Sequence, residues 1–176
     1  MAGPVLTDGV VTLRSWRRGD VGEMVACLDG DEEVYRWLDQ IPQPYSPSDA
    51  LAFMNRTDET AFAVTAAETG RVLGGIGLRW NEDRDVAETG YWLRADARGG
   101  GVMTRALVLV SGLALELGAA RVQLRADAEN LASRHVAERA GFRQDGILRS
   151  ARWSPRLGRR QDWVMYSLLP GELREP

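Results

Sequence analysis

Three consecutive glycines lie in the middle of the chain, directly before a predicted apolar helix. They are Gly99, Gly100 and Gly101, and Arg98 precedes them. Because glycine has no Cβ, this run lets backbone N–H groups come close to a ligand. The start of a helix adds unpaired N–H donors and a partial positive charge. The segment is therefore a candidate phosphate-binding loop, and the alternative is an ordinary turn.

A carboxylate, Glu88, lies in the strand predicted just before this loop. Alternation along a strand places it on one face with Val86, Gly90 and Trp92. A carboxylate held there could act as a general base, directly or through a water molecule. The alternative is a surface glutamate on a half-exposed strand.

Asn130 and Ser133 lie at the beginning of another predicted helix. Asparagine is a favoured N-cap residue, so capping alone would explain Asn130. The single histidine, His135, does not face Ser133, because residues two apart on a helix point in different directions. One histidine and one cysteine make a metal site implausible, so we expect no metal.

Apolar periodicity predicts a mixed α/β fold that would position these residues. Strands are predicted at 10–16, 61–67, 72–80, 85–94, 122–126, 142–149 and 161–168, and helices at 21–28, 31–38, 47–55, 101–117 and 130–140. The helix over 101–117 has a wide apolar stripe and should be largely buried against the sheet.

Length and composition favour one domain over residues 1–176. The net charge of −3 makes nucleic-acid binding unlikely, although all 22 basic residues are arginines. Cys27, the single cysteine, is expected to be a buried thiol. No signal peptide or membrane span is predicted, so we expect a cytoplasmic protein.

The segment 86–107 resembles the pyrophosphate loop of the GNAT (GCN5-related N-acetyltransferase) superfamily, together with its flanking strand and helix. Met103 departs from the small residue that the family pattern has there, and it is unremarkable in the RimJ/RimL-like branch, which acetylates ribosomal-protein N termini. The likeness also covers 13–17, Asn130-x-x-Ser133 with 138–142, and 162–168. These motifs occur in the family's order and extend over nearly the whole chain.

The resemblance implies the GNAT fold, with a central, mostly antiparallel sheet of about seven strands, a V-shaped split and helices on both faces. The pantetheine arm of coenzyme A would enter between the strand ending at Leu93 and the strand at 122–126. A backbone N–H near Leu93, at a bulge, would polarise the thioester carbonyl. Acetyl-CoA is the implied co-substrate, and its implied binding residues are Trp92, Leu93, Arg94, Arg98, Gly99, Gly100, Gly101, Val102, Met103, Thr104, Asn130 and Ser133.

The same resemblance implies direct acetyl transfer to a primary amine. Glu88 would be the base or bind the amine, and Ser133 would protonate the departing thiolate. Tyr166 is a weaker candidate for that acid and is expected in the core. Tyr35 and Trp37 would border the acceptor cleft, where nearby acids would suit a cationic amine; the alternative is a solvated helix face with core aromatics. These acids are Asp29, Asp31, Glu32, Glu33 and Asp39.

Several questions stay open at this stage. The acceptor could be a protein N-terminal amine or a small-molecule amine, the donor could carry a longer acyl group, and the chain could be a monomer or a homodimer. A non-catalytic CoA-binding sensor or assembly module is the alternative from another functional class. The arginine-rich segment 152–160 could contact the cofactor's 3′-phosphate, an acidic partner or only water.

Overall fold

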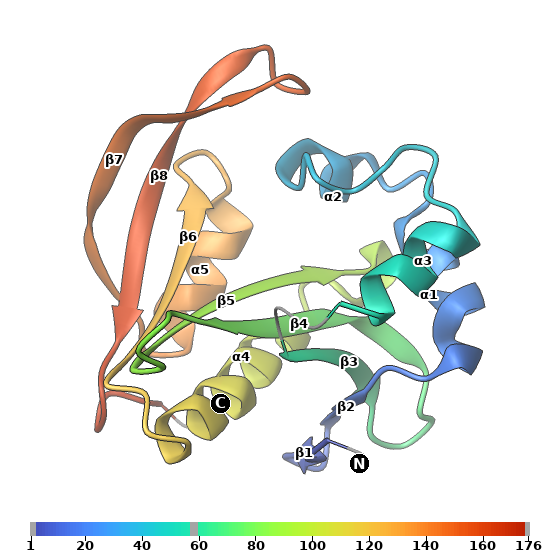
Figure 1. The fold of residues 1–176 in the computed structure, drawn as a ribbon, viewed down its shortest axis with the longest axis horizontal. Coiled ribbons are helices and arrows are strands. Elements are labelled where there is room, and N and C mark those ends of the chain that lie inside the picture. Colours follow the sequence, from blue (N-terminus) through green and yellow to red (C-terminus); the bar gives the residue numbers. More distant parts are fainter. Residues whose placement is uncertain (1–2, 57–59, 175–176) are drawn as a thin grey trace.

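The computed structural model describes residues 3–56 and 60–174 and has one twisted sheet with helices on both faces (Figure 1). The strand order is β1-β2-β3-β4-β5-β6-β8-β7. All neighbouring strands are antiparallel except β5 and β6, which are parallel. The strands are β1 (Leu6–Thr7), β2 (Val11–Ser15), β3 (Thr60–Ala66), β4 (Val72–Trp80), β5 (Val86–Leu93), β6 (Arg121–Asp127), β7 (Arg143–Ser154) and β8 (Arg159–Leu168).

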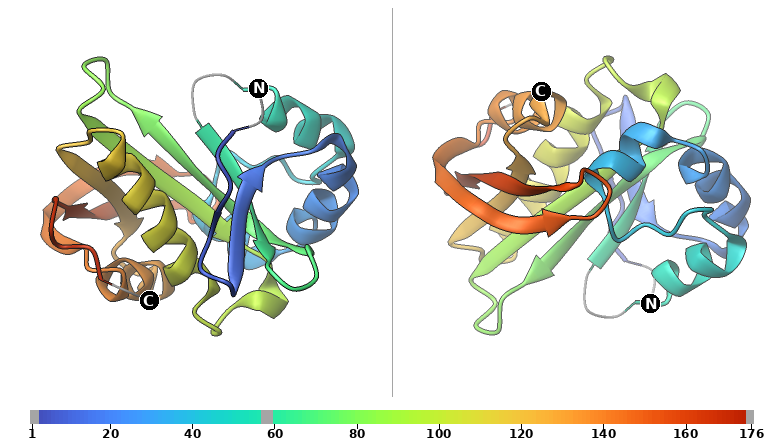
Figure 2. Two further views of the ribbon diagram at one scale, coloured as in Figure 1. Left: turned by 90° about the horizontal axis from the view of Figure 1, so that it is seen from below. Right: turned by 90° about the horizontal axis from the view of Figure 1, so that it is seen from above.

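Five α-helices of the described residues cover the sheet. They are α1 (Val21–Leu28), α2 (Glu32–Trp37), α3 (Pro47–Met54), α4 (Val102–Glu116) and α5 (Leu131–Arg139). Two of them, α4 and α5, pack together on one face of the sheet. Helices α1 and α3 pack together on the opposite side (Figure 2). Helices on both faces confirm the predicted layer arrangement.

Two apolar clusters correspond to these two faces. The larger one joins α4 to the sheet through residues such as Leu107, Ile76 and Leu124, all nearly inaccessible to solvent. The smaller one joins α1 and α2 to β4 through Met24, Tyr35 and other buried side chains. Successive residues of a strand point to opposite faces, so β5 contributes Ala87 to the first cluster and Trp92 to the second.

The split in the sheet lies between β5 and β6. These parallel strands pair only from Val86 with Arg121 to Glu88 with Gln123. Beyond that point β5 continues to Leu93 while β6 pairs with β8 on its other side. The predicted V-shaped opening is therefore present, with Glu88 at its closed end.

The β7–β8 hairpin is a long arm whose tip reaches α2 (Figures 1 and 2). Arg156 at this tip donates hydrogen bonds to the backbone carbonyls of Tyr35 (2.7 Å), Leu38 (2.9 Å) and Ile41. The Ser154 hydroxyl also donates to Asp39 Oδ1, at 3.0 Å. The hairpin tip is thus fastened to the segment that follows α2.

The other arginines of segment 152–160 also have partners within the chain. Arg152 lies 3.5 Å from an Asp39 carboxylate oxygen, and Arg160 donates to the carbonyl of Ser150. Arg159 pairs with Asp127 at 3.1 Å. The guanidinium groups of this segment thus hold the protein's own backbone and carboxylates, while the Arg152 and Arg159 side chains stay 44% and 32% exposed.

Most predicted elements are confirmed within one or two residues, and the differences lie at the sheet edges. The sheet has eight strands instead of about seven, because the two-residue β1 is too short to show alternation. Strand β7 was predicted to end at 149 but extends to Ser154, and β8 begins at Arg159. No helix within the described residues is long and apolar enough to cross a membrane.

Candidate functional site

The glycine loop has the backbone geometry of an anion-binding turn. Gly99 and Gly101 have φ angles of +81° and +76°, which L side chains rarely adopt. A Cβ on Gly99, Gly100 or Gly101 would have no heavy atom within 4 Å, so the loop surface is open. No side chain from the described part of the chain caps the first turn of α4, and its N–H groups are directed at this space. A diphosphate fits these donors.

The flanking residues of the loop have different roles in the structure. The Arg98 guanidinium donates to the Leu93 carbonyl from Nε (3.1 Å) and Nη2 (2.9 Å), and it forms an ion pair with Asp31. Met103 is only 4% exposed and packs in the larger cluster, whereas Thr104 is partly accessible. Met103 is therefore a core residue whose backbone alone can face a ligand.

The backbone of Leu93 faces the split. The neighbouring Arg94 N–H donates to the Leu73 carbonyl on β4 at 2.9 Å. Since N–H groups of successive strand residues point to opposite edges, the Leu93 N–H points toward β6. The prediction of a bulge near Leu93 is wrong. Strands β4 and β5 pair in continuous register from Gly74 with Leu93 to Trp80 with Ala87. An ordinary strand already directs this donor into the opening.

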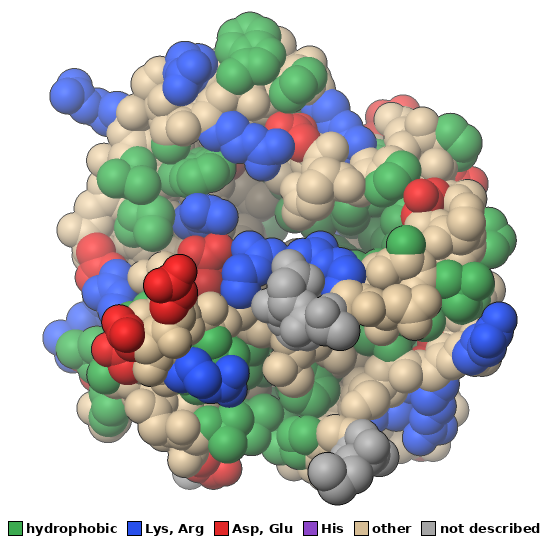
Figure 3. All heavy atoms as spheres, viewed as in Figure 1, with side chains coloured by type: hydrophobic (Ala, Val, Ile, Leu, Met, Phe, Trp, Pro, Cys, Tyr) green, Lys and Arg blue, Asp and Glu red, His purple; other side chains and the backbone are tan. Residues whose placement is uncertain are grey.

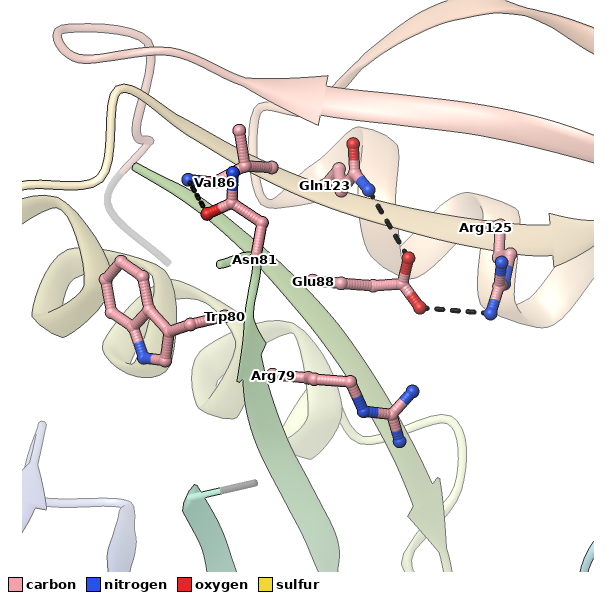
Figure 4. Close-up of a pocket in the computed structure, with 7 residues that line it drawn as sticks. All are labelled: Arg79, Trp80, Asn81, Val86, Glu88, Gln123 and Arg125. Carbon is pink, nitrogen blue, oxygen red and sulfur yellow. Dashed lines mark hydrogen bonds and ion pairs between the residues drawn. The ribbon is translucent and has the colours of Figure 1, made fainter. Parts of the chain in front are cut away.

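Glu88 lines a pocket of about 250 Å³ at the closed end of the split (Figure 4). Its carboxylate lies 3.1 Å from Arg125 Nη2 and accepts a hydrogen bond from Gln123 Nε2 at 3.3 Å. The apolar surroundings suggested by strand alternation are wrong, because β6 brings two polar side chains to the carboxylate. The full lining is Arg79, Trp80, Asn81, Val86, Glu88, Gln123 and Arg125.

Ser133 lies at the start of α5 and meets a tyrosine from β5. The Tyr91 hydroxyl is 3.0 Å from Ser133 Oγ and also donates to the Ser133 carbonyl at 3.1 Å. Burial raises the pKa of Tyr91 to about 12, so the phenol remains protonated at neutral pH. Asn130 accepts from the Ser133 N–H at 3.1 Å, as expected for an N-cap.

Residues 11–143 match the family model described as "Acetyltransferase (GNAT) domain". The chain belongs to the GNAT acetyltransferase family. A protein of Bacillus subtilis, named as a probable N-acetyltransferase, YjcK, is 33% identical over 100 residues, which are 54% of this chain and 55% of the relative. The chain thus matches about half the length of that relative.

Solved structures share the GNAT fold at low sequence identity. An acetyltransferase (GNAT family) from Bacillus anthracis has a TM-score of 0.82 and 17% identity, covering 94% of this chain and 98% of that one. Mycobacterium smegmatis RimJ in complex with CoA-disulfide also has a TM-score of 0.82, with 20% identity over 99% of this chain and 89% of that one. The predicted likeness to the RimJ/RimL branch is confirmed at the level of the fold.

The GNAT domain does not bring the predicted acceptor residues to the Glu88 pocket. Tyr35 is 3% exposed, lies in the smaller cluster and has Arg156 over its ring at 5.1 Å. Trp37 is partly exposed and donates from Nε1 to Glu33 at 2.7 Å. Burial contradicts an acceptor-binding role for Tyr35, and the alternative of a core aromatic is the correct one.

Sequence reasoning missed Tyr91 and Arg79. Tyr91 alternates with Glu88 along β5, so it should point to the opposite, α4-covered face, where a buried hydroxyl needs a partner. That signal was available and predicts a hydrogen bond to a neighbouring helix. Arg79 reaches the pocket only because β4 and β5 pair Arg79 directly with Glu88, a register that the hairpin fixes.

Proposed function

We propose that this protein transfers an acetyl group from acetyl-CoA directly to a primary amine, with residues 1–176 acting as one catalytic domain. The observation that carries the proposal is the convergence of three features on one split between strands. The open glycine loop follows the end of β5, the Leu93 N–H is on the β6 side of that strand, and Glu88 lies where the pairing of β5 with β6 ends. The GNAT solved structures with a bound CoA species support the same co-substrate.

The loop would bind the pyrophosphate of the co-substrate. Residues Gly99 to Thr104 offer backbone N–H groups, and Arg98 adds a positive charge at the edge of the loop. Arg98 donates a hydrogen bond to the Leu93 carbonyl and forms an ion pair with Asp31, so it also connects the loop to the end of β5. Trp92, Leu93 and Arg94 would then border the pantetheine arm, with Asn130 on the facing helix.

Bound acetyl-CoA supplies an activated thioester carbonyl. The Leu93 N–H would donate to this oxygen as charge develops on it. Glu88 would accept a proton from the amine, directly or through a water molecule, at the closed end of the split. The lone pair of the neutral amine is then available to attack.

Ser133 would return a proton to the departing thiolate. Its hydroxyl lies 3.0 Å from that of Tyr91, whose raised pKa keeps it protonated. Because Tyr91 donates its own proton to the Ser133 carbonyl, its hydroxyl oxygen would orient the Ser133 hydroxyl through the contact between the two. Tyr166 is fully buried and bonded to Glu138 and Arg134, as expected for a core residue.

The test combines binding and turnover. Calorimetry with CoA should give a saturable 1:1 isotherm, and a thiol-release assay with acetyl-CoA should show turnover on a panel of peptides with free N termini and of small-molecule amines such as aminoglycosides. Turnover on one group alone identifies the acceptor class. Lack of CoA binding would contradict the proposal, and binding without turnover on a broad panel would favour a CoA-binding sensor.

A further inference from the structure

The β7–β8 hairpin carries apolar side chains at positions where polar ones are expected. In β8, Val164 and Tyr166 are fully buried in the larger cluster, so Trp163 and Met165, which alternate with them, point to the other face. In an antiparallel sheet with one solvated face, such positions are usually polar. Trp163 and Met165 are apolar and partly exposed, so this face of β8 departs from the usual pattern.

Leu148 of β7 extends this apolar surface. It pairs directly with Trp163, so the two side chains lie on the same face, and it is 51% exposed. Gly146 pairs with Met165, and a Cβ added to Gly146 would have no heavy atom of the described residues within 4 Å. The space beside Met165 is therefore open. We call the three side chains of Leu148, Trp163 and Met165 the apolar shelf.

The apolar shelf is continuous with the Glu88 pocket through Arg125. Arg125 pairs with Met165 in the sheet, and its guanidinium carbon lies 4.4 Å from the centre of the Trp163 ring. Its Nη2 atom lies 3.1 Å from a Glu88 carboxylate oxygen. Because one C–N bond of about 1.33 Å joins these two atoms of Arg125, the ring centre lies within about 9 Å of that oxygen.

The space-filling view shows the same arrangement. Hydrophobic side chains gather over the hairpin, on the left of the face in Figure 3, and arginine and acidic side chains lie below them, beside the central hollow. Each partner in a stable dimer buries about 800 Å², and three partly exposed side chains do not supply that area. A small apolar group of the acceptor therefore fits the apolar shelf better than a second copy of the chain.

The charged groups around the split offer less to an acceptor, because they already have partners. Arg125 pairs with Glu88, and Arg79 also has an interaction within the protein. The acids near α2, which were expected to attract a cationic acceptor, are engaged as well. Their partners are the Tyr45 N–H for Asp29, Arg98 for Asp31, Trp37 for Glu33 and Ser154 for Asp39. Selection by apolar contact fits this face better than selection by charge.

We infer that the acceptor is a peptide N terminus with an apolar second or third residue, and that the apolar shelf binds this side chain. The pocket of about 250 Å³ would hold the residue that carries the amine. An extended peptide advances about 3.3 Å per residue, so an amine at Glu88 places the second or third side chain over the shelf. Leu148 is thus a specificity-determining residue. This inference rests on the proposed function and narrows its acceptor.

The experiment uses a host pentapeptide amide with a free N terminus, alanine at position one and serine at the other positions. Leucine replaces serine at position two, three or four in turn, and each peptide is titrated into the CoA-saturated protein in a calorimeter. Leucine at position two or three should lower the Kd about tenfold relative to the host, because burying a leucine side chain contributes on that scale. Leucine at position four should have no effect.

Salt distinguishes an apolar contact from a charged one. Raising the NaCl concentration from about 50 mM to about 500 mM should leave the leucine preference intact, because salt screens charges and does not weaken apolar contacts. A preference that disappears at high salt would overturn the assignment of the apolar shelf.

Substitutions on the hairpin locate the preference. Leu148→Ser should bring the ratio of the host Kd to the leucine-peptide Kd near one. Ile147→Ser is the matched control, because Ile147 is 52% exposed but pairs with the buried Val164 and so lies on the opposite face. Its ratio should equal that of the wild type. Trp163 is left in place, because it also contacts Arg125 and its loss would disturb Glu88.

A second copy of the chain is the other occupant to test, by sedimentation of the wild-type protein and of Leu148→Ser. A monomer, or a dimer that Leu148→Ser leaves intact, supports a free apolar shelf. A dimer that Leu148→Ser dissociates would overturn the inference, because the shelf would then be a contact between copies.

The remaining outcomes separate the inference from the proposed function. Equal affinities for all peptides, no binding of any of them, or a preference that Leu148→Ser leaves intact would overturn the inference, whether or not acetyl transfer occurs. A leucine preference that depends on Leu148, without thiol release from acetyl-CoA on any amine, would support the inference and contradict the proposed function.

Discussion

At the scale of single residues, Glu88 is the carboxylate whose position the proposed chemistry depends on most. It is the last residue of β5 that pairs with β6, and it is the only acid among the described residues that line the pocket. The structure adds what the sequence could not show, namely that Gln123 and Arg125 orient it. Their contacts engage both oxygens of the carboxylate from the β6 side.

Replacing Glu88 tests its role as base. Glu88→Gln keeps the size of the side chain and removes its ability to accept a proton, so we expect kcat to fall by about 100-fold or more. The measurement is the initial rate of thiol release at saturating substrates. Glu82→Gln, on the exposed turn between β4 and β5, is the matched control and should retain the wild-type kcat. A Glu88→Gln enzyme within about threefold of wild type would assign the base elsewhere.

The pair formed by Ser133 and Tyr91 shows where residue-level prediction succeeds and where it stops. The N-cap role of Asn130 followed from residue type and is confirmed by its bond to the Ser133 N–H. The contact with Tyr91 joins residues 42 positions apart. Alternation gives the face of β5 on which Tyr91 lies, but only the packing of α5 against the sheet decides which side chain its hydroxyl meets.

At the scale of elements, the glycine loop and the start of α4 together form the proposed phosphate-binding site. A substitution at Gly100 tests this site. This residue has no positive φ, and a Cβ there would have open space around it. Gly100→Ala should therefore leave the melting temperature within about 2 °C, because it creates neither strain nor a clash. The new methyl group would occupy the space that a phosphate needs, so the Kd for CoA should rise about tenfold.

Gly19→Ala is the control for this substitution. Gly19 also has open space around its Cβ position and no positive φ, and it lies far along the chain from the loop. Its CoA affinity should match that of the wild type in calorimetry. An unchanged affinity in Gly100→Ala would show that phosphate does not bind at this loop.

The β7–β8 hairpin and α2 form a second testable pair of elements. Arg156 donates to three backbone carbonyls, and its removal leaves them without these donors. Arg156→Ala should lower the free energy of unfolding by about 1–3 kcal/mol, as measured in urea. Hydrogen exchange should become faster in α2 and the residues after it.

Arg160→Ala is the comparison for this hairpin substitution. Arg160 bonds to the Ser150 carbonyl within the same hairpin and does not connect it to α2. The Arg160→Ala substitution should therefore leave hydrogen exchange in α2 unchanged. Equal exchange in both variants would mean that the tip does not fasten α2.

Element prediction from the sequence was accurate for well-buried elements and poor at edges. The boundaries of α1 and β4 were predicted without error, because α1 has an apolar stripe, β4 is a nearly continuous run of apolar residues and glycines, and polar residues flank both. The end of β7 was missed because most of this strand is exposed, so no alternation marks it. Its pairing with β8 past residue 150 is set by tertiary contacts at the hairpin tip.

At the scale of the whole molecule, two apolar clusters cover opposite faces of a sheet that splits between β5 and β6. The fold class and the position of the split could be predicted from the order of elements together with the family resemblance. The roles of the acids near α2 could not, because several of their partners are distant in sequence. Asp39, for example, accepts from Ser154 and lies near Arg152.

Alkaline stability is a property of the whole chain that its composition makes unusually simple to predict. All basic side chains are arginines, which keep their charge far into the alkaline range, so no lysine titrates. The groups that lose protons above about pH 9 are chiefly the four tyrosines and Cys27. Burial raises the pKa of every tyrosine, and of Tyr45 and Tyr91 to about 12. Burial also raises the pKa of the Cys27 thiol.

The sign of the effect follows from proton linkage. Below about pH 10, the tyrosines are protonated in both states and stability does not depend on them. Between about pH 10 and the raised pKa of the folded state, the unfolded chain has lost protons that the folded chain retains, so the free energy of unfolding must fall. Each tyrosine can contribute a slope of about 1.4 kcal/mol per pH unit at most. The stability that each tyrosine contributes is lost as the pH rises through the pKa of that tyrosine in the folded state.

Urea denaturation between about pH 8 and about pH 11 measures this slope. Tyr45→Phe removes one titrating hydroxyl that donates to Met24 Sδ at 3.4 Å and keeps the buried ring, so its stability should fall less steeply above about pH 10 than that of the wild type. Adding Tyr91→Phe on the opposite face of the sheet should flatten the curve further, because it removes a second hydroxyl whose pKa is raised in the folded state. Parallel curves for all three proteins would mean that these hydroxyls titrate alike in the folded and unfolded states.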